Sequence, residues 1–163
     1  MKEYLNQLLE DGAFVAVEMP AWKIVTAPWV VMKCRYGCPR YSHNRSCPPF
    51  APDWRSTREI LDSYNRAIIF GVRTMAEGTP LALATLRRLG NAGYYKAIGF
   101  GTGPCCRCKE CNVAECPTPA EVLPSPEACG IDVVGTVRRA GLHIDMPPKP
   151  GKELSCYAII LVD

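Results

Sequence analysis

Four of the five cysteines in residues 105–116 restrict what this chain can be more than any other feature of its sequence. Cys105, Cys108 and Cys111 are separated by two residues each, and Cys116 follows after a gap of four. A loop without a metal rarely contains so many cysteines. Repeated two-residue gaps let successive sulfurs reach different metal atoms of one inorganic core. The spacing therefore predicts an iron–sulfur cluster within residues 105–116, with the rest of the chain as its housing.

This stretch also resembles the cluster-binding run of bacterial ferredoxins, which has three residues where this chain has four before its Cys-Pro pair. Gly101 and Gly103 let the backbone turn tightly and approach inorganic sulfides. Arg107 and Lys109 offset part of the negative charge that a cluster carries. The alternative is zinc, which prefers paired Cys-x2-Cys units separated by a longer spacer. Three cysteines with overlapping gaps fit a 4Fe-4S cluster better than a zinc ion.

A second cysteine group lies upstream, where Cys34, Cys38 and Cys47 share a proline-rich loop. Three local thiols predict a metal site that takes a fourth donor from elsewhere or leaves one position open; the alternatives are a structural zinc site or a set of buried thiols. Cys129 is one candidate for the fourth donor. In two-cluster ferredoxins the cysteine before proline ligates the other cluster, so Cys116 can instead join the upstream three while Cys129 completes the downstream three.

Either pairing turns eight cysteines into two four-thiolate sites and predicts one or two 4Fe-4S clusters, with zinc as the alternative cofactor. The predicted cofactor and metal ligands are Cys34, Cys38, Cys47, Cys105, Cys108, Cys111, Cys116 and Cys129. Cys106 and Cys156 remain outside this set. Cys106 adjoins a predicted ligand, and Cys156 lies in an apolar strand, where a buried thiol is the ordinary explanation.

An open fourth position would matter for chemistry, because an iron without a protein thiolate can bind substrate as a Lewis acid. His43, Arg40 and Arg45 lie in the same upstream loop, where the histidine is an alternative ligand and the arginines are alternative anion-binding groups. A solvated loop remains the favoured interpretation for both arginines. The sequence has no Gly-rich dinucleotide fingerprint, phosphate-binding loop or Ser-His-Asp signature, so catalytic residues stay unassigned.

Length and composition describe one soluble globular domain over residues 1–163, with 48% hydrophobic and 21% charged residues. A net charge of +3 is too mild to predict nucleic-acid binding. The acidic, amphipathic N-terminus lacks the continuous apolar region of a signal peptide, and no apolar run reaches membrane-spanning length. These features predict a cytoplasmic protein without a membrane partner. In that reducing compartment, clustered cysteines favour metal binding over disulfides.

Helix and strand patterns alternate along the chain and predict an α/β (α+β) fold, with a mixed β-sheet, packed helices and two cysteine-rich metal-binding loops at an edge or end of the sheet. Helices are predicted over residues 3–10, 56–65, 74–95 and 125–139, and strands over residues 14–19, 23–26, 29–32, 67–72, 97–101 and 155–162. The third helix can begin at Thr74 or Thr79, and Ser56 or Thr57 can cap the second. Residues 147–152 are predicted to form a turn or an exposed linker.

Three sequence boxes in a fixed order extend the comparison to nearly the whole chain. They are Cys34-x3-Cys38 with Cys47-Pro48-Pro49-Phe50, then Gly103-Pro104-Cys105 through Cys111, then Pro124 through Val133. Together they resemble the prokaryotic family of uncharacterised, cysteine-rich predicted metal-binding proteins. The resemblance implies a metal or iron–sulfur protein of the prokaryotic cytoplasm, and it implies no known reaction.

Three functions are consistent with these patterns. The first is an iron–sulfur protein that relays electrons to a redox partner protein, which requires a cluster near the surface. The second is an enzyme that uses an open cluster iron at the loop of Cys34, Cys38 and Cys47, which predicts a pocket beside that loop. The third is a zinc-stabilised binding module without a redox role. The oligomeric state does not follow from the sequence.

Overall fold

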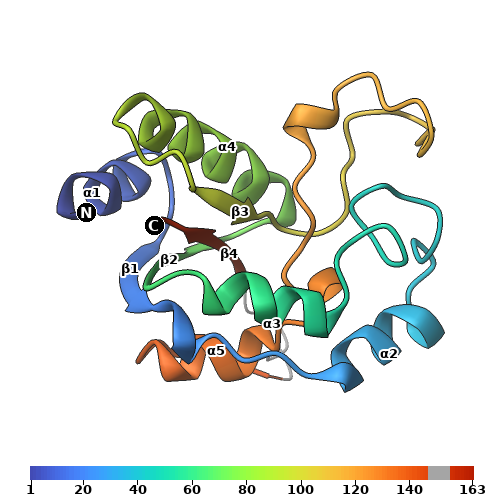
Figure 1. The fold of residues 1–163 in the computed structure, drawn as a ribbon, viewed down its shortest axis with the longest axis horizontal. Coiled ribbons are helices and arrows are strands. Elements are labelled where there is room, and N and C mark those ends of the chain that lie inside the picture. The colour runs from blue at the N-terminus through green and yellow to red at the C-terminus, as the bar shows by residue number, and fades with distance from the viewer. Residues whose placement is uncertain (147–154) are drawn as a thin grey trace.

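A four-stranded antiparallel sheet forms the centre of the computed structural model, which describes residues 1–146 and 155–163 (Figure 1). Its strands are β1 (Val15–Pro20), β2 (Arg66–Val72), β3 (Ile98–Phe100) and β4 (Cys156–Leu161). They are arranged in the order β1-β2-β4-β3, and each of the three neighbouring pairs is antiparallel. The α+β class is therefore confirmed, and the strand directions correct the expected mixed sheet to an antiparallel one.

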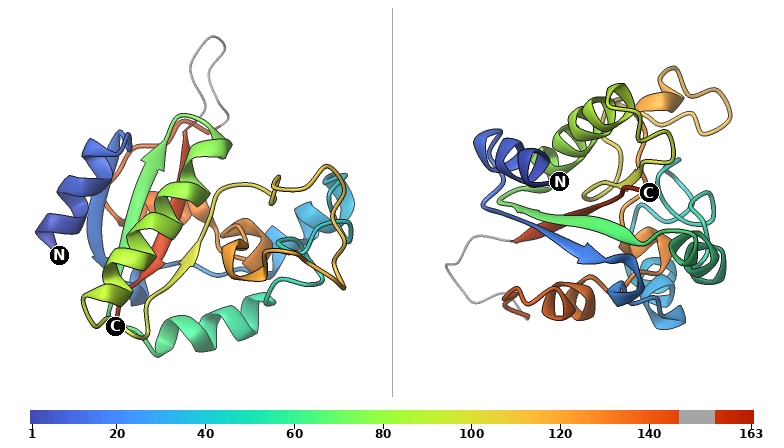
Figure 2. Two further views of the ribbon diagram at one scale, coloured as in Figure 1. Left: turned by 90° about the horizontal axis from the view of Figure 1, so that it is seen from above. Right: turned by 60° about the vertical axis from the view of Figure 1, so that its left-hand side comes forward.

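Helices cover both faces of this sheet. Helices α1 (Lys2–Glu10) and α4 (Met75–Asn91) lie on one face, and α3 (Trp54–Asp62) and α5 (Val133–Arg139) lie on the other, as the two views of Figure 2 show. In β2, Ile68 and Phe70 pack in the core beneath α1 and α4, whereas Ile69 packs in the core beneath α3 and α5. A strand buried on both faces reads as a continuous apolar run, which explains the pattern of residues 67–72.

Several predicted elements are confirmed with small changes at their ends. The first helix, the strands over residues 14–19, 67–72 and 155–162, and the extended segment over 97–101 are present as α1, β1, β2, β4 and β3. Helix α3 begins earlier than expected because the Asp53 carboxylate accepts hydrogen bonds from the N–H groups of Arg55 and Ser56. Helix α4 begins after Thr74, whose N–H donates to the Glu77 carboxylate, and it ends before Tyr95. The predicted turn over residues 147–152 lies outside the described residues.

The two strands expected before the upstream cysteines are wrong. Residues Ala21–Lys23 form a short 3₁₀ helix, η1, and Pro28–Gly37 form helix α2. Pro28 is well suited to the first turn of a helix, because its missing N–H has no intrahelical partner there. Val30 and Val31 favour β-structure locally, but they form part of the helix that begins at Pro28. Val30 is the buried residue of α2. The helix places Cys34 and Cys38 one turn apart.

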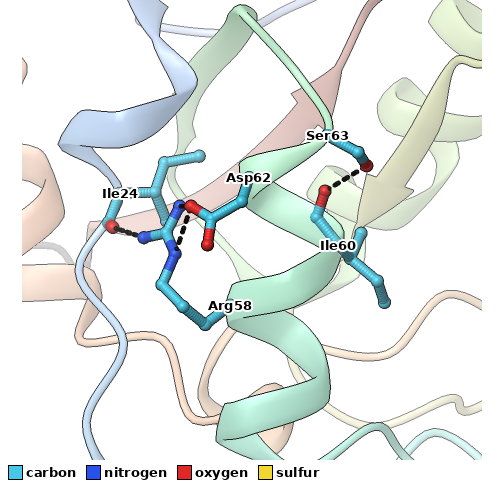
Figure 3. Close-up of polar contacts among 5 residues, drawn as sticks. All are labelled: Ile24, Arg58, Ile60, Asp62 and Ser63. Atoms are coloured by element: carbon cyan, nitrogen blue, oxygen red, sulfur yellow. Dashed lines mark hydrogen bonds and ion pairs between the residues drawn. The ribbon is translucent and has the colours of Figure 1, made fainter.

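Arg58 links α3 to the segment that leads into α2 (Figure 3). Its Nη1 donates to the Ile24 carbonyl at 2.9 Å, while Nε and Nη2 lie 2.9 and 2.8 Å from Oδ1 of Asp62. One rigid guanidinium thus satisfies a backbone carbonyl and a carboxylate together. This contact fixes the start of the chain that carries the upstream cysteines against the body of the fold.

The helix predicted over residues 125–139 is interrupted. It divides into the 3₁₀ turn η3 (Glu127–Cys129) and helix α5, whose first turn is capped by Asp132. Between them Gly130 has a φ of +76°, and a side chain there would place Cβ 2.5 Å from Cβ of Trp54. Only glycine satisfies both the left-handed backbone and the close approach of α3.

We expect Gly130→Ala to lower the free energy of unfolding by about 2–4 kcal/mol, because left-handed strain and overpacking against Trp54 add together. Gly141→Ala is the matched control, since Gly141 also has a positive φ but meets no atom within 4 Å. The control should lose only the strain, about 1 kcal/mol. Urea unfolding followed by circular dichroism measures both, and equal losses would contradict the steric argument.

In the described residues, 1–146 and 155–163, no helix has both the length and the apolar character needed to cross a bilayer.

Candidate metal centre

The two cysteine-rich loops meet at one end of the sheet, although α3, β2, α4 and β3 lie between them in sequence. Residues 38–53 and residues 101–126 lie side by side at the right of Figure 1, and both views of Figure 2 agree. Asn44 donates from Nδ2 to the Cys105 carbonyl at 2.7 Å, and the Cys105 N–H donates to Oγ of Ser46 at 2.8 Å. Oδ1 of Asn44 in turn accepts hydrogen bonds from both N–H and Oγ of Ser46. Both side chains are buried, so these bonds hold the loops together in a low-dielectric setting.

Arginines reinforce the same junction from the outside. Arg45 donates to the Val113 carbonyl at 2.7 Å, across the gap between the loops. Two further ion pairs hold the downstream loop itself: Glu121 pairs with Arg107 of the same loop and with Arg87 of α4. Sequence reasoning assigned Arg45 to a solvated loop and did not single out Asn44 or Ser46. Their sequence signal is weak, because Asn and Ser are ordinary turn residues in any loop.

Four of the five cysteines of the downstream loop line one small pocket. Its volume is about 20 Å³, room for about one water molecule. The thiols share the pocket with two cationic side chains and with no carboxylate or imidazole among the described residues; the lining includes Cys105, Cys108, Cys111, Cys116, Arg45 and Arg107. Four soft donors beside two positive charges are the donor set expected for an anionic, thiolate-bound metal centre.

The upstream thiols line a different and much larger pocket, with a volume of about 790 Å³. Cys34 lies in the last turn of α2, and the N–H of Cys38 donates to its carbonyl at 3.2 Å. Cys47 follows in the loop and is 9% exposed. Burial raises the pKa of Cys34, and the charges of Cys38 and Cys47 raise it further. The three thiols are therefore electrostatic neighbours on the wall of one pocket.

The two cysteine groups are also electrostatic neighbours of one another. Burial raises the pKa of Cys47 above its usual value, and the charges of both Cys38 and Cys111 add to this, whereas Arg40 and the Ser46 hydroxyl lower it. Cys111 belongs to the downstream pocket, so its influence on Cys47 bridges the two sites. In the described residues, no group of three or more His, Cys, Asp or Glu side chains could hold a metal ion as it stands. The fold therefore brings several thiols to the lining of each pocket, but their sulfur atoms are not arranged as the ligands of one metal ion.

Cys129 and Cys156 exchange the positions that the sequence suggested for them. Cys129 is 0% exposed and packs in the core with residues such as Leu61 and Ile131, outside the described lining of either pocket. Burial raises its pKa to about 12. Cys156 stands at the start of β4 and does line the large pocket. His43 is exposed, and Arg40 lines the large pocket near Cys47.

One protein family shares the sequence pattern of this chain. The family model described as "Predicted metal-binding protein (DUF2284)" matches residues 17–162. The chain belongs to this family. The resemblance seen in the cysteine boxes is therefore confirmed, and the matched range holds all ten cysteines. No curated protein and no solved structure matches the chain significantly. Membership in this predicted metal-binding family supports a cysteine-rich metal protein and leaves the metal itself open.

In this metal-binding family member, thiol reactivity should follow burial. We expect iodoacetamide to label the exposed Cys106 and Cys108 of the reduced, metal-free protein first at pH 8, and Cys129 last. A thiol with a pKa of about 12 holds only about one part in ten thousand of reactive thiolate at that pH. Mass spectrometry of timed digests gives the order, and all ten cysteines should react in urea. Labelling of Cys129 as fast as Cys106 would contradict its burial.

Proposed function

We propose that this protein binds a 4Fe-4S cluster through Cys105, Cys108, Cys111 and Cys116, and that the chain is one iron–sulfur domain. The observation that carries the proposal is the shared lining of the small pocket: four thiols, two arginines and no other acidic donor among the described residues. Soft thiolates select zinc, copper(I) or iron–sulfur centres over hard cations. The overlapping two-residue gaps favour the iron–sulfur centre among these. Once bound, the cluster would supply one-electron chemistry at this loop.

Electron transfer is the role that the arrangement of the two loops supports best. Hydrogen bonds from Asn44 and to Ser46 join the upstream loop to Cys105, and Cys47 lies within electrostatic reach of Cys111. A second centre at Cys34, Cys38 and Cys47 would therefore be a close neighbour of the first. Neighbouring centres and a mainly exposed downstream loop suit a protein that takes electrons at its surface and passes them inward.

The surface beside the upstream cysteines suits a redox partner of acidic character. Between Glu18 and Asp53 the sequence has five lysines and arginines and no aspartate or glutamate. Helix α2 exposes Trp29, Met32 and Tyr36 within this basic segment. Exposed aromatic side chains with surrounding positive charge favour docking by a negatively charged protein surface.

The metal identity is tested by anaerobic purification followed by iron, sulfide and zinc analysis, with EPR spectroscopy after reduction. Two 4Fe-4S clusters give about eight irons per chain and one gives about four. A colourless protein that contains zinc and no sulfide would overturn the proposal. Reconstitution with iron and sulfide under strictly anaerobic conditions separates a lost cluster from one that never bound.

A second candidate function has its own supporting observation. The sequence predicted a pocket beside the upstream loop if an iron there were open to substrate, and a 790 Å³ pocket is lined by Cys34, Cys38 and Cys47. That volume lies in the range of small-molecule sites, and its lining is mostly apolar with a few charged groups. An enzyme that binds substrate at a three-thiolate cluster would need this geometry. Cyanide, a small donor for open iron, should then change the EPR spectrum of one cluster and leave the other unchanged.

A further inference from the structure

The upstream site has three thiols of its own, and the fold shows which side chains are placed to supply a fourth donor. Cys34 lies in the last turn of α2, Cys38 directly follows this helix, and η3 packs against it. The first residue of η3 is Glu127, and it lines the same 790 Å³ pocket as Cys34, Cys38 and Cys47. Glu127 is exposed to solvent and is part of the lining of this pocket. A carboxylate and three thiols thus line one pocket.

Cys129 follows Glu127 by two residues in the same 3₁₀ turn. A 3₁₀ helix has about three residues per turn, so these two side chains project about 120° apart around its axis. Glu127 projects to the pocket, and Cys129 projects to the core, where it is fully buried among apolar side chains. A metal ligand needs a deprotonated thiol, and the core is a poor place for one. The turn that brings one donor to the pocket therefore turns the other away.

Charge alone does not separate the two candidates, because Cys34 is an electrostatic neighbour of both Glu127 and Cys129, and the pocket lining decides between them. Apart from burial, the charges that raise the pKa of Cys34 belong to Cys38, Glu127 and Cys47. The Glu127 carboxylate lines the pocket together with the three thiols, whereas Cys129 is outside that lining.

We propose that Glu127 is the fourth donor of the upstream metal site, giving a set of three thiolates and one carboxylate with Cys34, Cys38 and Cys47. The assignment rests on the proposed function, because it assumes a metal centre at these cysteines. Carboxylate oxygen is a harder donor than thiolate and binds iron in a thiolate site less firmly. Glu127 therefore closes the site at rest and gives way to a small Lewis-basic ligand that enters from the pocket.

Iron content and EPR spectra of four variants test the proposal. Glu127→Gln should change the EPR signal of one cluster and lower the iron content by about one atom per chain, because a neutral amide holds its iron poorly. Glu127→Cys should restore the iron with an altered signal. Cys129→Ala should keep wild-type iron and signal. Glu18→Gln, which replaces an exposed carboxylate on β1, is the matched control and should match the wild type.

Far-UV circular dichroism shows whether each variant folds, and Cys129→Val preserves the core volume if the alanine variant does not. Loss of iron in the Cys129 variants, with Glu127→Gln unchanged in iron and signal, would overturn the assignment and leave the second centre intact. A Cys34→Ser variant with wild-type iron would show that no upstream centre exists, which overturns both the assignment and the two-centre form of the proposed function.

Discussion

Replacing Cys108 by serine is expected to remove about four irons per chain, the content of one cubane cluster, while any upstream centre keeps its own. Cys108 is exposed and lines the small pocket, so it makes little contribution to packing. Serine retains the size of the side chain but is a poor donor to iron at neutral pH. The fold should therefore persist while the downstream centre is lost. Iron and sulfide analysis, EPR of the reduced protein and thermal unfolding measure the three parts of this result.

Cys106 supplies the control for this experiment. It is exposed like Cys108 and lies two residues away, but it is not part of the small-pocket lining, and its thiol contacts the Pro104 carbonyl. Cys106→Ser should retain wild-type iron. If both variants lose the same amount of iron, metal binding does not depend specifically on the four cysteines that line the small pocket. If Cys108→Ser keeps all of its iron, the ligand assignment is wrong.

Asn44→Ala is expected to lower the free energy of unfolding by about 3 kcal/mol and to deplete both metal sites together. Asn44 is 2% exposed, and its amide links the Ser46 hydroxyl and N–H to the Cys105 carbonyl. Removing it leaves several buried polar groups unpaired, and each such group costs about 1–3 kcal/mol. Because the same bonds join the two loops, neither pocket keeps its shape. Urea unfolding and iron analysis on the same preparation give both quantities.

Asn6→Ala is the matched substitution at an exposed position of α1 and should change stability by less than about 0.5 kcal/mol. The comparison with Cys108→Ser is also informative. Cys108→Ser removes one centre from a stable protein, whereas Asn44→Ala should weaken both centres and the fold at once. An Asn44 variant with wild-type stability and only the downstream iron lost would show that the loops fold independently.

The sheet and the downstream loop were accessible from the sequence because both depend on local pattern. The short, continuous apolar run over residues 67–72 predicts a strand buried on both faces. In the structure it forms β2, which lies between β1 and β4 in the sheet. Two-residue gaps keep Cys105, Cys108 and Cys111 so close along the chain that a compact loop brings them to one pocket. Short-range spacing thus carries most of the information about that site.

The upstream site was less accessible because it is assembled from distant pieces. Trp29–Met32 has the composition of a strand, yet it forms a helix after Pro28, where the structure pairs no neighbouring strand with it. A single glutamate such as Glu127 has no spacing pattern that marks it as a metal ligand. Its proposed role as a fourth donor depends on how η3 packs against α2. Cys129 was a candidate ligand from its position in the sequence, but in the structure it is fully buried and is not part of the pocket lining that includes Cys34.

The sequence by itself determined the alternation of elements, the downstream four-cysteine loop and the family of predicted metal-binding proteins, since each depends on residue type and short spacing. Tertiary structure alone decided how the two loops meet, through Asn44 and Ser46, and which side chain faces the upstream thiols. The physical reason is that hydrogen bonds and burial between distant segments depend on packing. Spacing along the chain does not encode them.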